Sequence, residues 1–224
     1  MAEKLLFWDA GHGGNDPGAV GNGLKEADLA IEIVNYAYAH IDKNYVCKQY
    51  KDISADSLNV IISRANNMGA DLVVSNHLNA FRPNVGNGYE ALVYSEANDD
   101  LAEVFEKHIK AVGQNSRGIK YRPDLAILRD TKMKAILNEI AFIDTWNDIK
   151  DWDEDHELKK MGEALAEAAA EYLKLPKKAK APAKAETTKK LYRVQIGAFS
   201  EKKNADAMLE RAIKAGFKDA FISY

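Results

Sequence analysis

The sequence predicts an α/β fold in which a largely parallel, twisted sheet is covered by helices on both faces. Short apolar runs alternate along the chain with longer segments whose apolar residues recur at helical spacing. The 224 residues are 46% hydrophobic and 29% charged, which suffices for a packed core and excludes a disordered or collagen-like chain. Strands that alternate with helices build parallel sheets, because each connection crosses a face of the sheet.

The elements follow one another in the order that this fold needs. The expected strands are short, with apolar or mixed patterns, and comprise residues 5–8, 45–50, 71–76 and 89–94. The expected helices have apolar residues three or four positions apart and comprise residues 27–41, 57–68, 99–112 and 157–173. A further segment, residues 135–142, is apolar except at two positions.

The composition changes after residue 175. Residues 176–190 are rich in Lys, Ala and Pro and have no apolar face, which predicts a flexible linker. Residues 191–224 then predict one small β-α-β unit, with a strand at 191–197, a helix at 202–215 and a strand at 218–223. We therefore expect a main domain at 1–175, the linker, and a C-terminal unit at 191–224.

The net charge of −3 conceals a division between these parts. Residues 1–175 contain 19 Lys and Arg against 29 Asp and Glu, a net charge of −10. Residues 176–224 contain 12 against 5, a net charge of +7. Such asymmetry indicates two modules with different partners. The basic part has no zinc-finger or RNP-like motif, so we do not expect nucleic acid to be its partner.

Several classes of protein are excluded. No apolar run approaches the roughly 18–20 residues of a membrane helix, so we expect no membrane insertion. The single cysteine, Cys47, excludes an internal disulfide and a zinc site built from several thiolates. The apolar run near the start of the chain comprises only residues 5–8, because the charged Asp9 follows. Such a run is too short for the apolar stretch of a secretory signal. We expect synthesis in the cytoplasm without a signal peptide.

Four ionisable residues occupy positions at which an α/β fold places its active site. His12 follows the first strand within a glycine turn, and His77 follows the strand at 71–76. The carboxyl ends of parallel strands share one edge of a sheet, so these two histidines should converge. Glu26 opens the first long helix and reaches the same edge if the loop before it folds over that edge. Glu139 lies within the apolar segment.

Two imidazoles and one carboxylate around an open position form a catalytic zinc site. Zinc lowers the pKa of its bound water to about 7 and polarises a carbonyl, and a further carboxylate must then move the protons. Glu139 fits this role, because burying it without purpose would be costly. Taken singly, each residue also fits a structural role, such as a hydrogen-bonded histidine, a helix-start carboxylate or a salt-bridged glutamate.

Three blocks of sequence surround these residues: WDAGHGGNDPGAVGNGLKE at 8–26, SNHLNA at 75–80 and LRDTKMKAILNEIAFI at 128–143. In content and order they resemble the motifs of zinc-dependent N-acetylmuramoyl-L-alanine amidases. The resemblance implies that His12, Glu26 and His77 hold zinc and that Glu139 is catalytic. Two positions depart from the family pattern: Ala10 stands where Pro is usual, and Asn76 where Ile or Val is usual. The second change should alter the surroundings of His77 and could affect metal affinity.

The C-terminal unit resembles a sporulation-related repeat (SPOR), which binds peptidoglycan. The similarity lies in LYRVQIGAFS at 191–200, Asn204-Ala205 and residues 215–217. That module normally has two β-α-β halves, and a 34-residue unit lies below the roughly 40 residues at which a domain folds unaided. We therefore expect pairing with the same segment of a second chain, a homodimer, with a degenerate tail as the alternative.

Together the resemblances imply a peptidoglycan hydrolase that uses zinc-activated water to cleave the amide between N-acetylmuramic acid and the L-alanine of the stem peptide. Among enzymes, the alternative is a zinc carboxypeptidase or peptidase acting on the stem peptide. Outside enzymes, it is a wall-binding protein with an inactive catalytic domain. The expected setting is a phage endolysin that reaches the wall through a holin pore, or an autolysin that acts when a sporulating mother cell lyses.

Overall fold

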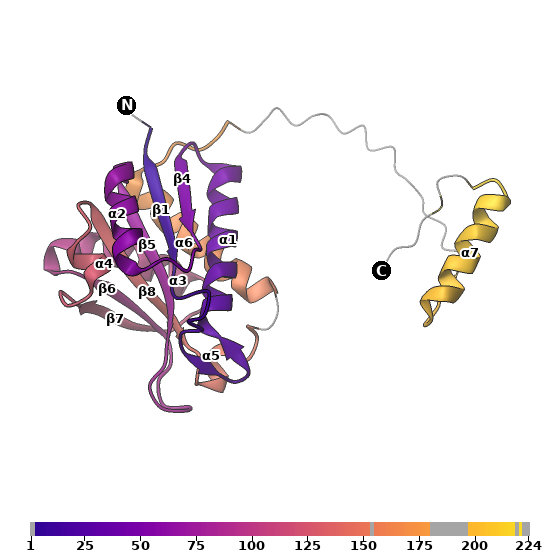
Figure 1. Cartoon of the computed structure of the whole chain (residues 1–224), viewed down its shortest axis with the longest axis horizontal. Coiled ribbons are helices and arrows are strands. Elements are labelled where there is room, and N and C mark those ends of the chain that lie inside the picture. Colours follow the sequence, from indigo (N-terminus) through magenta and orange to yellow (C-terminus); the bar gives the residue numbers. More distant parts are fainter. Residues whose placement is uncertain (1–2, 153–154, 180–196, 218–219, 221–224) are drawn as a thin grey trace. The chain divides into compact units, whose positions relative to one another are not determined.

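The computed structural model describes residues 3–152, 155–179, 197–217 and 220 (Figure 1). The chain divides into two compact units, Met1–Ala179 and Lys180–Tyr224. Within the described residues, no helix is both long and apolar enough to cross a membrane.

A six-stranded sheet forms the centre of the first unit, in the order β4-β1-β5-β8-β6-β7. The strands are β1 (Leu5–Ala10), β4 (Lys48–Asp52), β5 (Leu72–Asn79), β6 (Tyr89–Val93), β7 (Ser116–Tyr121) and β8 (Lys134–Phe142). The first four strands in this order are parallel, whereas β6 runs antiparallel to β8 and parallel to β7. The predicted largely parallel sheet is therefore confirmed. A short hairpin, β2 (Val20–Gly21) and β3 (Leu24–Lys25), lies outside this sheet.

Helices cover both faces of the sheet, as the sequence predicts (Figure 1). One face carries α1 (Glu26–Asn44), α3 (Asp99–Ala111) and α6 (Asp155–Leu173), and the other carries α2 (Leu58–Met68) and α4 (Ala126–Arg129). A 3-10 turn (Glu96–Asn98) precedes α3, and the short helix α5 (Trp146–Ile149) follows β8.

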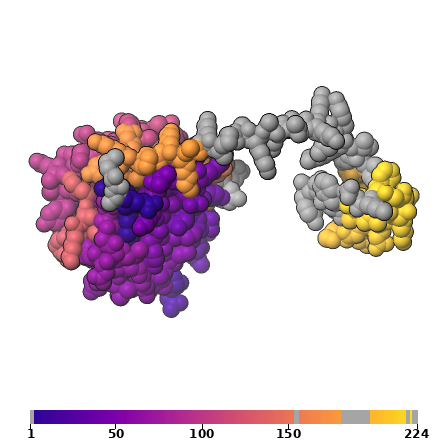
Figure 2. Space-filling model, turned by 90° about the horizontal axis from the view of Figure 1, so that it is seen from above, coloured from indigo at the N-terminus to yellow at the C-terminus, as the bar shows by residue number. Residues whose placement is uncertain are grey.

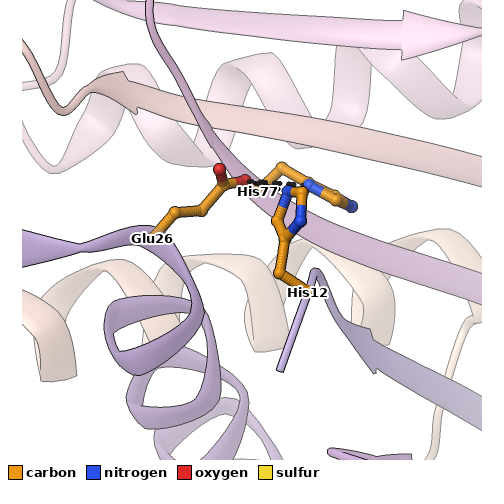
Figure 3. A group of neighbouring side chains, drawn as sticks. All are labelled: His12, Glu26 and His77. Carbon is orange, nitrogen blue, oxygen red and sulfur yellow. Dashed lines mark hydrogen bonds and ion pairs between the residues drawn. The ribbon is translucent and has the colours of Figure 1, made fainter. Parts of the chain in front are cut away.

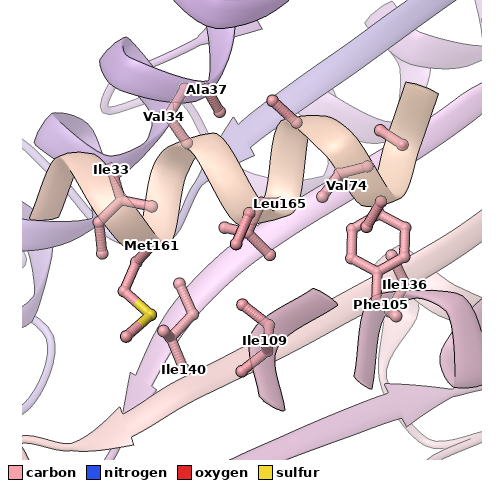
Figure 4. Close-up of a cluster of buried hydrophobic side chains, with 14 of the residues drawn as sticks. Ile33, Val34, Ala37, Val74, Phe105, Ile109, Ile136, Ile140, Met161 and Leu165 are labelled. Atoms are coloured by element: carbon pink, nitrogen blue, oxygen red, sulfur yellow. The ribbon is translucent and has the colours of Figure 1, made fainter. Parts of the chain in front are cut away.

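The alternation of side chains along the central strands divides the core into two layers. Val74 and Ile136 pack with α1, α3 and α6, as Figure 4 shows, whereas Val73 and Leu137 pack with α2 and α4. Both faces of β5 and β8 are thus buried, which explains their almost continuous apolar sequences. Where these strands carry polar residues, those residues therefore need a partner or a function.

Most predicted elements agree with the structure; the short elements β2, β3, α4 and α5 were not predicted, and two strands differ as well. The strand expected at 45–50 begins only at Lys48, because Tyr45 ends α1 and Val46 donates its backbone N–H to the carbonyl of Pro176 (2.8 Å). Strand β7 was not predicted. It is an edge strand with the sequence SRGIKY, none of whose residues is fully buried, so it lacks an apolar signal.

The first unit extends past the predicted boundary at residue 175. Lys177 forms a β-bridge with Tyr45, and the backbone N–H of Lys178 donates to the carbonyl of Asn44 (2.8 Å). The end of this unit, orange in Figure 2, therefore lies on the residues that follow α1. The first residues expected to belong to the linker are part of the packed unit.

The second unit contains α7 (Lys202–Lys214), which confirms the helix expected at 202–215. The strands expected at 191–197 and 218–223 fall almost wholly outside the described residues. Pairing of this unit with a second chain stays a prediction.

Candidate metal centre

Three of the predicted residues meet where β1 and β5 approach the start of α1 (Figure 3). His12 lies just after β1, and Glu26 is the first residue of α1. His77 lies within β5 rather than after it, because that strand continues to Asn79. The sheet edge therefore brings His12 and His77 together, as expected from the parallel strands.

The three side chains offer one compact set of donor atoms. One donor atom from each of His12, Glu26 and His77 can be chosen so that all lie within 4.8 Å of one another. The Glu26 Oε1 atom lies 2.9 Å from His77 Nδ1 and 3.2 Å from His12 Nε2. The two imidazole rings meet edge to face, with centroids 5.0 Å apart. Two imidazoles and a carboxylate at such distances fit a zinc-type donor set.

Glu26 is held in place by backbone groups on both sides. Its Oε2 accepts from the N–H of Ala19 (2.8 Å), and its Oε1 accepts from the N–H of Leu78 (3.0 Å). The side chain is almost fully buried. Burial by itself raises the pKa of Glu26, but hydrogen bonds from His77 and these backbone groups outweigh it and lower the pKa. The loop of residues 14–25 thus folds back over the edge, and the carboxylate stays ionised.

His12 is oriented by Asp16, a residue that the sequence did not single out. Asp16 Oδ2 lies 2.8 Å from His12 Nδ1, and its Oδ1 accepts from the N–H of Gly18 (3.0 Å). The hydrogen bond with His12 lowers the pKa of this carboxylate. A carboxylate on one imidazole nitrogen leaves the other free for a metal, which is a common arrangement around metal-bound histidines.

Two glycines leave the room that these side chains occupy. A Cβ atom at Gly11 would lie 2.2 Å from His77 Cε1, and one at Gly18 would lie 2.6 Å from Glu26 Oε2. Gly18 also has φ +64°, which side chains rarely adopt. His12 itself has φ 64°, an uncommon value for a residue other than glycine. Such backbone strain concentrates at functional sites.

Glu139 lies beside this group on the neighbouring strand. It is the register partner of His77 across β5 and β8, and its Oε2 atom is buried without a hydrogen-bond partner among the described residues. Burial raises the pKa of Glu139 to about 7; nearby Glu26 and Glu90 contribute, and His77 opposes the rise. A carboxyl group with this pKa can both accept and donate a proton near neutral pH.

Beneath the site, on the other face of the sheet, lie buried amides whose pairing the sequence did not predict. Asn76 donates from Nδ2 to the carbonyl of Asp9 (3.1 Å), and its Oδ1 accepts from Asn138 Nδ2 (3.2 Å). Asn138 Oδ1 in turn accepts from the Tyr89 hydroxyl (2.8 Å). All three side chains are fully buried. The polar residue before His77 is thus satisfied by a partner on β8.

Comparison with known proteins identifies two families along the chain. Residues 7–171 match the family described as N-acetylmuramoyl-L-alanine amidase, and residues 162–224 match the SPOR domain. The SPOR match begins within α6, whose residues Leu165, Ala166 and Ala168 to Ala170 are buried in the core of the first unit.

Relatives and solved structures come from the same family. The sporulation-specific N-acetylmuramoyl-L-alanine amidase of Bacillus subtilis is 32% identical, and the match covers 95% of this chain and 82% of that protein. The endolysin of Bacillus phage SPP1 is 36% identical, and the match covers 78% of this chain and 68% of that protein.

The catalytic domain of an N-acetylmuramoyl-L-alanine amidase from Bacillus (Paenibacillus) polymyxa superposes with a TM-score of 0.72 at 25% identity, over 77% of this chain and 99% of that one. An amidase from Clostridium difficile also gives 0.72, at 27% identity, over 77% and 97%. The comparisons give no support to the carboxypeptidase alternative. The chain belongs to the N-acetylmuramoyl-L-alanine amidase family and is a peptidoglycan hydrolase that cleaves the amide between N-acetylmuramic acid and the stem peptide.

Proposed function

We propose that this amidase depends on zinc, which His12, Glu26 and His77 hold, and that Glu139 is its general base and acid. The observation that supports this most directly is the convergence of three donor side chains within 4.8 Å of one another. The ionised Glu26 and the His12–Asp16 pair supply the charge and orientation that a divalent cation needs. Glu139 is the neighbour that does not belong to the donor set.

The division of work between these residues follows from their positions. Zinc held there would lower the pKa of a water and polarise the scissile carbonyl. Glu139, with a pKa of about 7, would accept a proton from the attacking water and then hand a proton to the leaving nitrogen of L-alanine. Its unpaired Oε2 faces no competing hydrogen-bond donor among the described residues, so it is free for this transfer.

Two substitutions separate metal binding from proton transfer. Glu139→Gln should retain zinc but lower kcat by about 10²–10⁴-fold, because only the proton transfer is removed. His77→Ala should lose both the metal and the activity. Zinc content is measured by elemental analysis, and the release of peptides with an L-Ala amino terminus by mass spectrometry of digested peptidoglycan. His156→Ala, at an exposed histidine on α6, is the matched control and should change neither.

Hydrolysis by Glu139→Gln at the wild-type rate would reject the role of Glu139. Full activity after exhaustive chelation would reject the dependence on zinc.

We also propose that the C-terminal unit binds peptidoglycan and that the enzyme acts in lysis, as a phage endolysin or as an autolysin of the mother cell. The SPOR match supports the first statement, and similarity to both a phage endolysin and a sporulation amidase supports the second. Expression inside a bacterial cell with and without a holin tests the lytic role. Lysis that needs the holin supports release through a pore, and lysis without it contradicts that route.

A further inference from the structure

A pocket of about 520 Å³ lies directly beside Glu139. It is lined from four strands, because Asn79 comes from β5, Glu90 from β6, Lys120 from β7 and Glu139 from β8. Glu139 shares its face of the sheet with its register partner His77. The pocket therefore opens next to the residues of the metal centre, on the side of Glu139 toward β7.

The position of Glu139 indicates which half of the substrate enters this pocket. Under the proposed function, on which this inference rests, Glu139 delivers a proton to the nitrogen of the departing L-alanine. The atoms next to that nitrogen belong to the stem peptide, whereas the sugar lies on the carbonyl side of the bond. A cavity that has Glu139 as a wall is therefore placed to receive the peptide.

The charges in the pocket favour an anionic group at its Lys120 end. Glu90 accepts from Asn79 Nδ2 (3.1 Å) and from Arg117 Nε (2.8 Å), so its carboxylate already has a cationic partner. Lys120 Nζ donates to the backbone carbonyl of Arg117 (3.0 Å). Among the described residues, no carboxylate lies within ion-pair distance of Lys120, which therefore brings an unbalanced positive charge to the wall.

Arg122 adds a second cationic side chain, whose charge Asp124 balances but which keeps a donor group. Its backbone N–H donates to the carbonyl of Val93 (2.8 Å), and its Nε and Nη2 donate to Asp124 (2.9 and 2.8 Å). Its Nη1 has no hydrogen-bond partner within the part of the chain that the structure describes. The guanidinium is thus held in one orientation with one donor group left over. A pre-oriented arginine beside a lysine is well suited to a carboxylate.

We propose that this pocket binds the stem peptide and that Lys120 and Arg122 select a free carboxylate on it. Stem peptides carry carboxylates at the residue that follows L-alanine and at their carboxyl terminus, and some walls convert such groups to carboxamides. A carboxamide has no charge, and an NH2 donor replaces one of the two acceptor oxygens, so it forfeits the charge-assisted bonds. Lys120 and Arg122 would then set which wall chemotype this amidase prefers.

The test compares substrates that differ in one functional group. Three disaccharide-peptides are prepared: one with both carboxylates free, one amidated at the residue after L-alanine, and one amidated at the carboxyl terminus. The wild type should cleave the first with a kcat/KM about tenfold above at least one amidated form, the size of one hydrogen bond to a charged group. The amidated substrate that is cleaved with the lower kcat/KM identifies which carboxylate is bound.

The variants Lys120→Gln and Arg122→Gln should each reduce this preference. They should cleave the substrate with free carboxylates more slowly than the wild type does, and the disfavoured amidated substrate at nearly the wild-type rate. Lys110→Gln is the matched control, because this exposed lysine lies in the last turn of α3, on the opposite face of the sheet. Equal cleavage of all three substrates by the wild type, or equal slowing of all three in both variants, would overturn the inference. Failure of the proposed function looks different, since it would appear as wild-type activity of Glu139→Gln or as full activity after chelation, whatever the preference among these substrates.

Discussion

At the scale of single residues, the candidate metal centre depends on side chains that do not themselves belong to the donor set. Asp16 fixes the imidazole of His12 through a 2.8 Å hydrogen bond and is fixed in turn by the N–H of Gly18. This exposed carboxylate contributes little to folding, because exposed ion pairs are weak. Its importance should therefore appear in metal binding rather than in stability.

We predict that Asp16→Ala lowers zinc affinity by about 10- to 100-fold, the usual cost of removing the partner of a metal-bound histidine. Competition with a chromophoric chelator measures the affinity. Asp28→Ala is a charge-matched control, because Asp28 is exposed in the first turn of α1 and has no bond to the centre. Equal affinities for the two variants would show that loss of negative charge, and not orientation of His12, is responsible.

The sequence made some of these residues predictable and not others. His12, Glu26, His77 and Glu139 stand out because ionisable groups are unusual beside buried strands and in apolar segments. Asp16, Lys120 and Arg122 are ordinary exposed charges in the sequence. Only the folding of residues 14–25 and the position of β7 bring them to the site. No periodicity in the sequence carries that information.

At the scale of elements, the geometry of the candidate site depends on the register between β5 and β8. His77 and Glu139 are side by side because Asn76 pairs with Asn138 one position earlier. Those two amides bond to each other on the opposite face, and a register shift of one residue would break the bond between these buried groups. The amide pair thus specifies the register between the two strands. Its polar residues interrupt strands that are otherwise largely apolar.

A double-mutant cycle on this pair tests the idea. Asn76→Val and Asn138→Val should each destabilise the protein by about 1–3 kcal/mol, because each leaves a buried amide without its partner. The double variant should lose less than the sum, with a coupling of about 0.5–3 kcal/mol measured by urea denaturation. If the destabilisation of the double variant equals the sum of the two single destabilisations to within about 0.3–0.5 kcal/mol, the pair does not act as a unit.

Elements were predictable to the extent that they are buried. The central strands and the helices that pack on them carry strong apolar patterns, and the structure has them close to the expected residues. Strand β7 escaped prediction because its edge position leaves its side chains partly or fully exposed. The same exposure makes β7 a wall of the pocket beside Glu139, so the element with the weakest sequence signal is one of those nearest to the chemistry.

At the scale of the whole molecule, the chain combines an acidic first unit with a basic C-terminal part. Two of the lysines that follow residue 175 lie on the first unit. Lys177 Nζ is 5.8 Å from the centroid of the Tyr45 ring, and Lys178 Nζ is 3.8 Å from a carboxylate oxygen of Asp42. The remaining lysines of residues 176–190 are those at 180, 184, 189 and 190.

Walls of the Gram-positive type carry anionic polymers, so these four lysines should hold the acidic catalytic unit near its substrate. Binding of the full chain to purified walls should weaken as salt rises from about 0.05 to 0.5 M, because the screening length falls well below 10 Å. Replacing the four lysines with glutamine should reduce binding at low salt and flatten the salt dependence. A chain with the same residues of 180–190 in scrambled order should bind like the wild type, since total charge rather than sequence supplies the attraction. Binding that does not respond to salt would assign wall affinity to the SPOR unit or to the catalytic groove instead.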